Sequence, residues 1–460
     1  MNEVRNGCTG LVPVHFFKRL GGAAAGLVLA ATPFSPAQAQ QTAATAAAVA
    51  SRPQNGQSVE DFYRARKDAL LWYSPTAGDA AQQLITLLGT ATFDGFDPRK
   101  YLTPETQELV QAARSGKRKH VERADKALSI AYAAYVADVK RDPGVGITYV
   151  DPGLRPAPPT PLAALLEAAA QPSLGDYLRN VGWMHPFYGQ LRGALAEHKY
   201  SDDRQRELIQ LNLQRARALP ASRGKYVLVN AAQQRLYMYD GGKPVDSMVV
   251  VVGKPKWPTP MLTAYIRFAA LNPYWYVPPD LAGEDVGQYV TKFGLKYLDD
   301  YGYEIVSDWT RNPAIIDPKT VDWKGVNDGT VNVMIRQKPG PKNFMGRVKF
   351  MFPNQFGVYL HDNPRRELFK ESTRYFSGGC VRLEDAWRLS KWLFGRDLTW
   401  EGAAPEEPVM LNAPVPVYIT YLTAMPDGEA VAYYDDAYGR DAPKLAATSA
   451  QGDGSSVASR

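Results

Sequence analysis

The stretch Lys225-Tyr226-Val227-Leu228-Val229-Asn230 divides this chain of 460 residues into two regions with different hydrophobic patterns. Together with residues 235–239 it flanks a short turn, which is the pattern of a β-hairpin. Further short apolar or β-branched segments follow at 245–252, 265–271, 331–335, 348–352, 357–361, 415–422 and 430–434. Many short strands separated by Gly and Pro predict a sandwich or a barrel, interrupted here by one helix at 384–394.

The region before this stretch has a mainly helical pattern, from residue 59 to residue 223. Residues 124–140 place Ala, Leu, Ile and Tyr on one broad face, and Asp142-Pro143-Gly144 ends that helix. A second helix is expected at 202–219. The fold class predicted from the two regions is α+β multidomain, with a mainly helical scaffold followed by a mainly β domain.

The beginning of the chain has the three parts of a secretory signal peptide. Basic residues come first, residues 20–31 form a short apolar stretch, and Ala37-Gln38-Ala39 is a small-residue cleavage site. The apolar stretch is too short to span a membrane comfortably, and no later segment reaches roughly 18 uninterrupted apolar residues. We therefore expect an exported protein without a stable membrane span.

A long excursion rich in Gly, Asp, Tyr and Trp separates two of the expected strands. A loop of that length inside a compact domain is usually functional and is often a lid. The expected organisation is a signal peptide (1–39), a disordered tether (40–58), a helical scaffold domain (59–223), a catalytic domain (224–442) with a cap subdomain (281–346), and a disordered tail (443–460).

Charge and histidine spacing exclude some classes of function. The formal net charge of +6 is a mild excess for a chain of this length, which suits an anionic polymer but not nucleic acid, because no basic stripe with interleaved aromatics is present. His120, His185 and His198 lack metal-ligand spacing and are expected to be surface or satisfied core residues. We expect no metal and no cofactor.

The two cysteines of the chain have very different positions. Cys8 lies in the expected signal peptide, so Cys380 would be the only thiol of the exported protein and could form no internal disulfide. It lies in the run Ser377-Gly378-Gly379-Cys380-Val381-Arg382, where the glycines allow a close approach of the backbone to a ligand. This pattern predicts a nucleophile, with the N–H groups of Gly379 and Cys380 as the oxyanion hole.

A thiol of ordinary pKa is mostly protonated at neutral pH and needs a base, and His361 is the only histidine after residue 223. It ends an apolar strand, 19 residues before Cys380, and the intervening loop could bring the two side chains together. No Asp or Asn follows in the order of a papain-like site, so a backbone carbonyl is expected to orient the imidazole. Arg382 shares a face with Cys380 and would either bind a substrate carboxylate or hold the loop.

The stretch Tyr359-Leu360-His361-Asp362, followed by Ser377-Gly378-Gly379-Cys380-Val381-Arg382, resembles the active-site motif of the L,D-transpeptidase (YkuD) family. The similarity is closest to the large periplasmic type with an N-terminal scaffold domain. Further landmarks of that type are Lys225 to Asn230, Val252-Gly253-Lys254-Pro255, Asn272-Pro273-Tyr274-Trp275, Val348 to Asn354, Pro416-Val417-Tyr418 and Tyr438-Gly439-Arg440-Asp441.

The resemblance implies a periplasmic enzyme that acts on peptidoglycan stem peptides. Cys380 would attack a tetrapeptide donor, with His361 as base, and the acyl group would pass to the diamino acid of a second stem to give a 3→3 cross-link. Water or an envelope protein as acceptor remains open, and a non-catalytic wall-binding protein is a third class. A carbapenem is expected to acylate Cys380.

Two features depart from the family pattern or leave alternatives open. Many members have His or Ser where this chain has Gly378, and residues 188–220 are too short for the peptidoglycan-binding module usual in the large type. Four aromatic residues are expected either to line the substrate cleft or to belong to the core: Tyr274, Trp275, Tyr276 and Tyr359.

Overall fold

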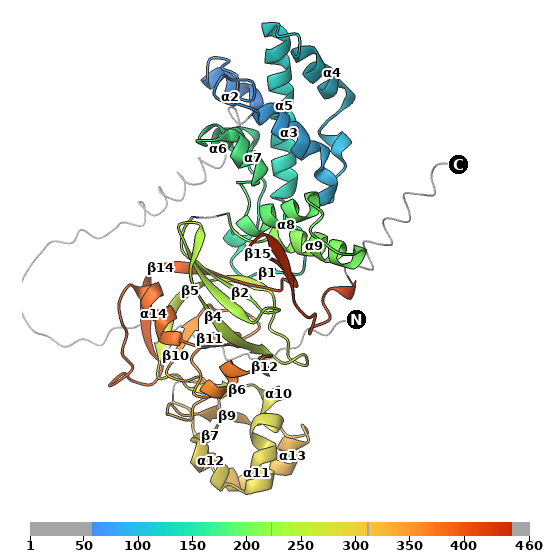
Figure 1. Cartoon of the computed structure of the whole chain (residues 1–460). Coiled ribbons are helices and arrows are strands. Elements are labelled where there is room, and N and C mark those ends of the chain that lie inside the picture. The colour runs from blue at the N-terminus through green and yellow to red at the C-terminus, as the bar shows by residue number, and fades with distance from the viewer. Residues whose placement is uncertain (1–57, 222, 311, 444–460) are drawn as a thin grey trace, which may run out of the picture.

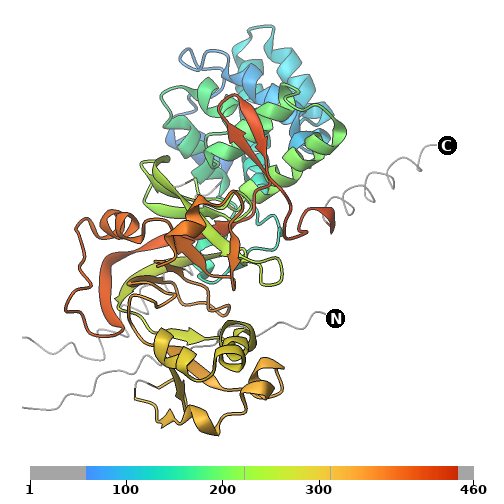
Figure 2. The same ribbon diagram turned by 60° about the horizontal axis from the view of Figure 1, so that its bottom comes forward.

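The computed structural model describes residues 58–443, except residues 222 and 311. The expected signal peptide, tether and tail lie outside the described residues, apart from Ser58 and Pro443. The described chain forms three parts in a row, with the helical region at one end, the β region in the middle and a smaller subdomain at the other end (Figure 1). Figure 2 shows the same order after rotation.

The helical region has an aromatic core. Its helices are α2 (Val59–Ala65), α3 (Ala80–Gly89), α4 (Pro104–Ala113), α5 (Arg118–Val139), α6 (Pro161–Ala169), α7 (Leu174–Arg179), α8 (Pro186–Ala196) and α9 (Asp203–Ala216), with 3₁₀ turns η1 (Ala91–Asp94), η2 (Pro98–Lys100) and η3 (Pro152–Leu154). The two helices expected from the sequence are therefore α5 and α9. Trp72, Trp183 and Tyr132 are buried at its centre, where large rings bury much apolar area.

The expected β domain closes into a barrel. Its strands are β1 (Thr148–Tyr149), β2 (Tyr226–Asn230), β3 (Arg235–Asp240), β4 (Lys243–Gly253), β5 (Leu262–Leu271), β10 (Val348–Met351), β11 (Leu360–His361), β12 (Tyr375–Ser377), β13 (Val381–Leu383) and β14 (Glu407–Thr420). Among the described residues, these ten strands run in the order β1-β5-β10-β11-β13-β4-β3-β2-β14, with β12 beside β4. A second pairing, between β14 and β5, closes the ring. The helix η6 (Arg366–Lys370) and α14 (Ala386–Phe394) complete the domain.

The expected hairpin at the start of this region is confirmed, because β2 and β3 pair antiparallel with Asn230 opposite Arg235. Two expected strands lie outside the barrel, and the one at 430–434 pairs with a neighbouring strand in a separate two-stranded sheet. The segment expected at 331–335 forms β9 (Met334–Gln337), which belongs to the cap sheet and not to the barrel. The strand expected at 415–422 is the end of a longer strand, since β14 begins at Glu407.

The long excursion is a folded subdomain and not an irregular loop. It contains β6 (Trp275–Val277), α10 (Pro279–Ala282), a π-helical turn η4 (Gly283–Gly287), α11 (Gln288–Phe293), α12 (Lys296–Tyr301), β7 (Tyr303–Val306), β8 (Ile315–Ile316), η5 (Pro318–Thr320), α13 (Trp323–Asn327) and β9. A four-stranded antiparallel sheet, in the order β6-β9-β7-β8, supports it. We call it the cap; it starts at β6, before residue 281, and has its own apolar core.

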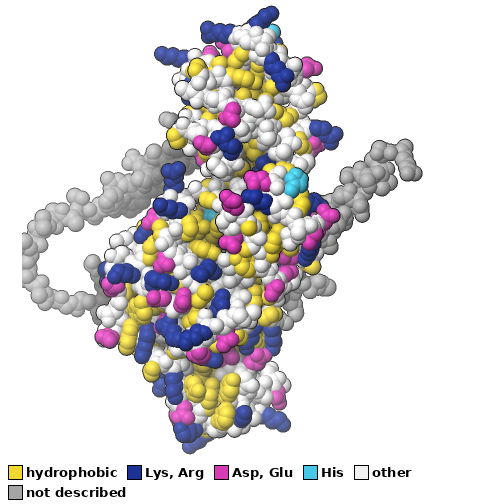
Figure 3. Space-filling model, in the orientation of Figure 1, with side chains coloured by type: hydrophobic (Ala, Val, Ile, Leu, Met, Phe, Trp, Pro, Cys, Tyr) yellow, Lys and Arg dark blue, Asp and Glu magenta, His cyan; other side chains and the backbone are white. Residues whose placement is uncertain are grey.

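The C-terminal part of the chain connects the barrel to the helical region. After β14, the hairpin of β15 (Ala424–Asp427) and β16 (Ala430–Tyr433) packs on α8 and α9. On the face shown in Figure 3, Lys and Arg are intermixed with Asp and Glu over all three parts. In the part of the chain that the structure describes, no helix has the length and apolar character needed to cross a membrane.

Candidate active site

Residues of the barrel and the cap together line a cavity of about 90 Å³. Cys380, His361 and Arg382 all line it. The cap contributes much of the remaining wall, through residues of β6, α10 and η4. The full lining is Tyr274, Trp275, Tyr276, Val277, Pro278, Pro279, Leu281, Asp285, Trp309, Phe344, Met345, Lys349, Met351, Gly357, Tyr359, His361, Ser377, Gly378, Cys380 and Arg382.

The register of two short parallel strands brings the expected site residues together. β11 pairs with β13 so that Leu360 lies opposite Val381 and His361 lies opposite Arg382. Cys380 immediately precedes β13. Because side chains two residues apart on a strand share a face, Cys380 and Arg382 lie on the face that also carries His361. The sequence expectation that the loop after the histidine strand returns beside it is therefore confirmed.

The loop before Cys380, residues 377–380, is held by hydrogen bonds of Ser377. Ser377 Oγ donates to the Cys380 carbonyl at 2.5 Å and accepts from Gly379 N–H at 3.1 Å. Gly379 has a φ of +115°, a conformation that other residues rarely adopt. We call residues 377–380 the nucleophile loop. Its Gly379 N–H, one of the two predicted oxyanion-hole donors, is bonded within the loop.

Gly378 lies where the cap touches this loop. A Cβ atom at Gly378 would meet Leu281 Cδ1 at 2.5 Å, which is too close for a real contact. Leu281 belongs to α10 of the cap and is itself buried. The absence of a side chain at Gly378 thus creates the space that Leu281 fills.

His361 is buried, with 2% of its surface exposed, and one ring nitrogen has a backbone partner. Its Nδ1 lies 2.6 Å from the carbonyl oxygen of Asp362. A carbonyl only accepts, so Nδ1 carries the proton and Nε2 keeps its lone pair. The expectation that a backbone carbonyl orients this imidazole is confirmed. Burial, followed by the charge of Arg382, lowers the pKa of His361 to about 3.

The thiol is also kept neutral by its surroundings. Burial raises the pKa of Cys380, while the Tyr359 backbone and the charges of Arg382 and Lys349 oppose that rise. Its Sγ lies 3.7 Å from the Gly357 carbonyl, which is a weak hydrogen bond. Both shifts favour the uncharged forms of the two groups, a thiol and a neutral imidazole.

Arg382 has unused hydrogen-bonding capacity. Among the described residues its Nε has no hydrogen-bond partner, although the atom is buried. Burial lowers the pKa of Arg382, and the carboxylate of Asp285 in the cap raises it. A guanidinium with a free N–H on a cavity wall is suited to a carboxylate ligand.

The sequence reasoning missed a second cation at the site. Lys349, on β10, is 3% exposed and pairs with Glu406 at 3.0 Å. Its Nζ lies within 5.7 Å of the ring of Tyr276 and 5.6 Å of that of Tyr359. The sequence did contain one indication of this paired cation, since Lys349 is a single lysine within an apolar strand. A lysine is almost never fully buried unless it is paired.

The four expected aromatic residues all line the cavity. Trp275 also packs in the cap core, with its ring 5.2 Å from that of Phe344, so it is both wall and core. Tyr274 donates its backbone N–H to Glu406 at 2.7 Å. Trp309, which the sequence did not single out, adds a further aromatic wall.

The histidines of the helical region are remote from this cavity. His185 is buried, with Nδ1 accepting from Phe187 N–H at 3.1 Å, but its Nε2 has no partner among the described residues. The expectation of a satisfied histidine therefore holds for one of its nitrogens only. Within residues 58–443, apart from 222 and 311, no three His, Cys, Asp or Glu side chains are grouped so that they could hold a metal.

Comparison with known proteins supports the resemblance. Residues 224–417 match the family model of the L,D-transpeptidase catalytic domain (YkuD), and residues 57–195 match the model of the Scaffold domain. A Haemophilus influenzae protein named “Putative L,D-transpeptidase” is 27% identical over 287 residues, which is 60% of this chain. The chain spans 57% of the length of that relative.

Two solved structures are also similar. The Ldtfm carbamoyl enzyme with avibactam is 15% identical over 44% of this chain and 51% of that chain, with a TM-score of 0.21. An L,D-transpeptidase from Mycobacterium smegmatis is 18% identical over 43% of this chain and 59% of that chain, with a TM-score of 0.20. TM-scores this low carry no structural argument. The family matches confirm the resemblance to L,D-transpeptidases with a scaffold domain.

Proposed function

We propose that this chain, whose residues 224–417 match the L,D-transpeptidase catalytic domain, forms 3→3 cross-links in peptidoglycan by cysteine acyl transfer. The donor would be a tetrapeptide stem and the acceptor the side-chain amine of a diamino acid in a second stem. The observation that carries the proposal is the convergence of Cys380, His361 and Arg382 on one cavity between barrel and cap.

In the acylation step, His361 acts as general base through Nε2. The Cys380 proton moves to Nε2 as Sγ attacks the carbonyl between the third and fourth residues of the donor. The tetrahedral oxyanion accepts a hydrogen bond from Cys380 N–H, since the other predicted donor, Gly379 N–H, is bonded to Ser377 Oγ. The imidazolium then protonates the leaving amine, D-alanine departs, and a thioester on Cys380 remains.

In the second step the acceptor amine attacks the thioester. Its proton passes to Nε2 of His361, and the imidazole returns it to the departing sulfur, so that the enzyme ends as it began. A neutral imidazole is required at the start of each step, and the lowered pKa of His361 supplies it at neutral pH. Deprotonation of the thiol within the step also fits the raised pKa of Cys380.

Arg382 is proposed to bind a carboxylate of the donor stem. The Nε–H, which has no partner among the described residues, supports this role. Tyr274, Trp275 and Tyr359 would then pack against the apolar parts of the stem peptide. The alternative role of Arg382, holding the loop through the other N–H groups of its guanidinium, is the second candidate role.

The division of the chain into a scaffold (59–223), a catalytic domain (224–442) and a cap (281–346 with β6 added) is part of the same proposal. Because the substrate lies in the cell wall, we also propose that residues 1–39 direct export and that the enzyme works in the periplasm. The cap would enclose the stem peptide, since it supplies much of the cavity wall.

The test is incubation of the exported chain with purified disaccharide-tetrapeptides, followed by mass analysis of the products. A 3→3 dimer with loss of D-alanine from the donor is the expected product, and Cys380→Ala should give none. Tripeptide without dimer would mean that water is the acceptor and would replace transpeptidation by L,D-carboxypeptidase activity. An adduct formed only when an envelope protein is added would assign that protein as acceptor.

A further inference from the structure

The C-terminal segment 435–441 reaches the barrel behind the nucleophile loop without lining the cavity. We call it the strap. Tyr438 OH donates to the Gly253 carbonyl at 2.7 Å, and Arg440 Nη2 donates to the Thr259 carbonyl at 2.9 Å. Gly253 and Thr259 flank the turn after β4, so the strap holds that turn from both ends.

Thr259 connects this turn to the nucleophile loop. It is fully buried, and its Oγ1 accepts from Gly253 N–H at 2.9 Å and donates to the Gly379 carbonyl at 2.8 Å. The directions are forced, because an N–H can only donate and a carbonyl can only accept. The hydroxyl therefore uses its one proton on Gly379, the residue before the nucleophile.

The backbone of the turn after β4 packs tightly against its surroundings. A Cβ atom at Gly253 would meet the Trp257 carbonyl at 2.0 Å and would lie 3.1 Å from Gly379 Cα. The backbone of the turn and the backbone of the nucleophile loop are thus in direct contact. A shift of the turn would move Gly379, whose φ of +115° sets the direction of Cys380 N–H.

The bonds of Thr259 and Ser377 together occupy both backbone polar groups of Gly379 and the carbonyl of Cys380. Thr259 occupies the Gly379 carbonyl, and Ser377 occupies Gly379 N–H and the Cys380 carbonyl. The loop is therefore pre-organised by two hydroxyl groups, one within it and one behind it.

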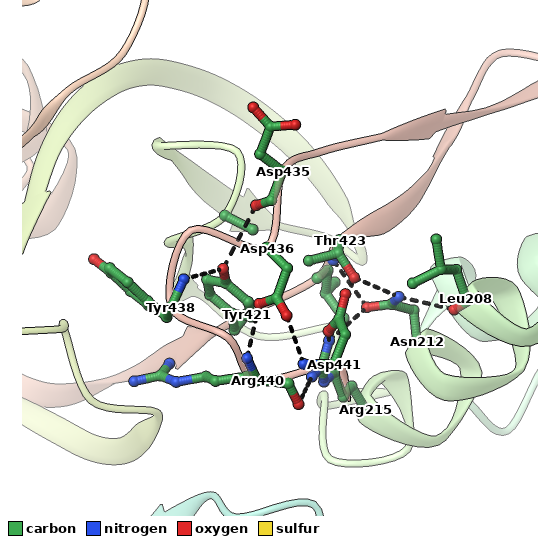
Figure 4. Close-up of polar contacts among 12 residues, drawn as sticks. Leu208, Asn212, Arg215, Tyr421, Thr423, Asp435, Asp436, Tyr438, Arg440 and Asp441 are labelled. Atoms are coloured by element: carbon green, nitrogen blue, oxygen red, sulfur yellow. Dashed lines mark hydrogen bonds and ion pairs between the residues drawn. The ribbon is translucent and has the colours of Figure 1, made fainter. Parts of the chain in front are cut away.

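The strap is fixed at its far end to the helical region. Arg215 of α9 pairs with Asp441 at 2.7 Å, and both side chains are 2% exposed. Arg215 Nη2 also donates to the Arg440 carbonyl at 3.1 Å, and Asp436 accepts the backbone N–H groups of Arg440 and Asp441 (Figure 4). A continuous set of hydrogen bonds thus leads from α9 through the strap and Thr259 to Gly379.

We propose that Thr259 is a positioning residue for the nucleophile loop and that the strap holds it in place. The inference rests on the proposed function only in that Cys380 is the nucleophile whose orientation matters. Without the Thr259 hydroxyl, Gly379 loses a backbone anchor, and the thiol moves relative to the Tyr359 backbone and the cations that favour its charged form. Both the acylation rate and the titration of Cys380 should then change.

The experiment compares Thr259→Val, which removes the hydroxyl at similar volume, with Thr259→Ser, which keeps it. Thr263→Val is the matched control, because Thr263 is equally buried and its Oγ1 has no partner among the described residues. The first readout is the rate of Cys380 alkylation by iodoacetamide from pH 6 to about 10, followed by peptide mass. The second is kcat and KM on disaccharide-tetrapeptides.

For Thr259→Val we expect the midpoint of the alkylation profile to rise by about half a unit or more. We expect kcat to fall by about 10- to 100-fold with KM changed by less than about threefold. Thr259→Ser and Thr263→Val should remain close to the wild type. Tyr438→Phe should shift the midpoint of the alkylation profile in the same direction but by a smaller amount. If Thr259→Val does not fold, Tyr438→Phe replaces it as the test variant.

An alkylation profile of Thr259→Val that superimposes on the wild type would overturn the proposal. If Thr259→Val shifts the alkylation profile but the profile of Tyr438→Phe equals that of the wild type, the part of the proposal that concerns the strap is overturned. Alkylation needs no turnover. If the wild type fails to act on muropeptides while Thr259→Val still shifts the profile and Thr259→Ser does not, the proposed function fails and the positioning role stands.

Discussion

The helical region and the cavity both bury charged groups, but they treat them in opposite ways. In the helical region, Asp94 is 1% exposed and accepts from Tyr135 OH at 2.8 Å, from Tyr188 OH at 2.6 Å and from Arg192 Nε at 3.1 Å. Arg192 in turn donates to the carbonyls of Leu87 and Thr90. A network in which these polar groups are partnered rigidifies a core.

In the cavity the same kinds of group are left with spare capacity. Arg382 Nε is buried without a partner among the described residues, and the bond of His361 Nδ1 to the Asp362 carbonyl leaves the lone pair of Nε2. An unpaired buried polar group costs stability, so its presence calls for an explanation. The comparison therefore sets one fully partnered cluster, around Asp94, against Arg382 at the cavity, whose buried Nε has no partner among the described residues; single unpartnered atoms such as His185 Nε2 also occur in the helical region.

The largest effect should come from the thiol. We expect Cys380→Ala to lower acyl transfer by at least about 10³-fold while the melting temperature stays near that of the wild type, because the substitution removes the nucleophile and few contacts. Product mass after incubation with tetrapeptides measures it. Intact mass after exposure to a carbapenem should show an adduct on the wild type only, and residual turnover in the variant would contradict the assignment.

The scaffold should respond in the opposite way. Asp94→Asn leaves Arg192 as a buried charge without its carboxylate, and we expect the free energy of unfolding to fall by about 3–5 kcal/mol. Activity per folded molecule should stay near that of the wild type. The control is Asp68→Asn, since the Asp68–Lys126 pair is 3.0 Å long but well exposed and should contribute at most about 1 kcal/mol. Urea unfolding of both variants measures the difference.

Arg382→Met tests the same comparison with a residue that lines the cavity. Because Nε has no partner to lose among the described residues, we expect only a small loss of stability, from the lost attraction to the Asp285 carboxylate, whereas kcat/KM should fall by about 10- to 100-fold as a charged hydrogen bond to the substrate disappears. A variant that unfolds as easily as Asp94→Asn, with unchanged kcat/KM when folded, would show that Arg382 is structural. The distinction between the two regions would then fail.

Acid should destabilise both regions through their buried histidines. Burial lowers the pKa of His185 to about 3, as it does for His361, from an ordinary value of 6.5. The unfolded chain takes up these protons below about pH 6.5 and the folded chain does not, so stability present above that pH is lost as pH falls toward 3. Each histidine should contribute about 1–2 kcal/mol of the loss between pH 7 and pH 5.

His185→Asn keeps an acceptor for Phe187 N–H and removes the titrating group. Its free energy of unfolding should therefore fall less between pH 7 and pH 5 than that of the wild type. Urea unfolding at the two pH values measures the change. An unchanged pH dependence would show that His185 is protonated in the folded protein.

The sequence alone determined the division at residue 225, the fold class and the three central residues of the candidate site. At this division the spacing of apolar residues changes from a helical period to the alternation of strands. That spacing follows from local backbone geometry and can therefore be read from the sequence. Cys380 and His361 could be selected because Cys and His are rare in this chain, and Arg382 because its spacing from Cys380 matches a known motif. Even the carbonyl that orients His361 belongs to the next residue in the chain.

Only the tertiary structure decided the rest of the site. Three of its features join residues that are far apart in the chain. These are the closure of the barrel by β5 and β14, the pairing of Lys349 with Glu406, and the packing of Leu281 against Gly378. The anchor of Gly379 is Thr259, 120 residues away. Such contacts depend on how helices, strands and loops pack against one another in the folded protein. They produce no periodic pattern in the sequence, because each partner by itself resembles an ordinary core or turn residue.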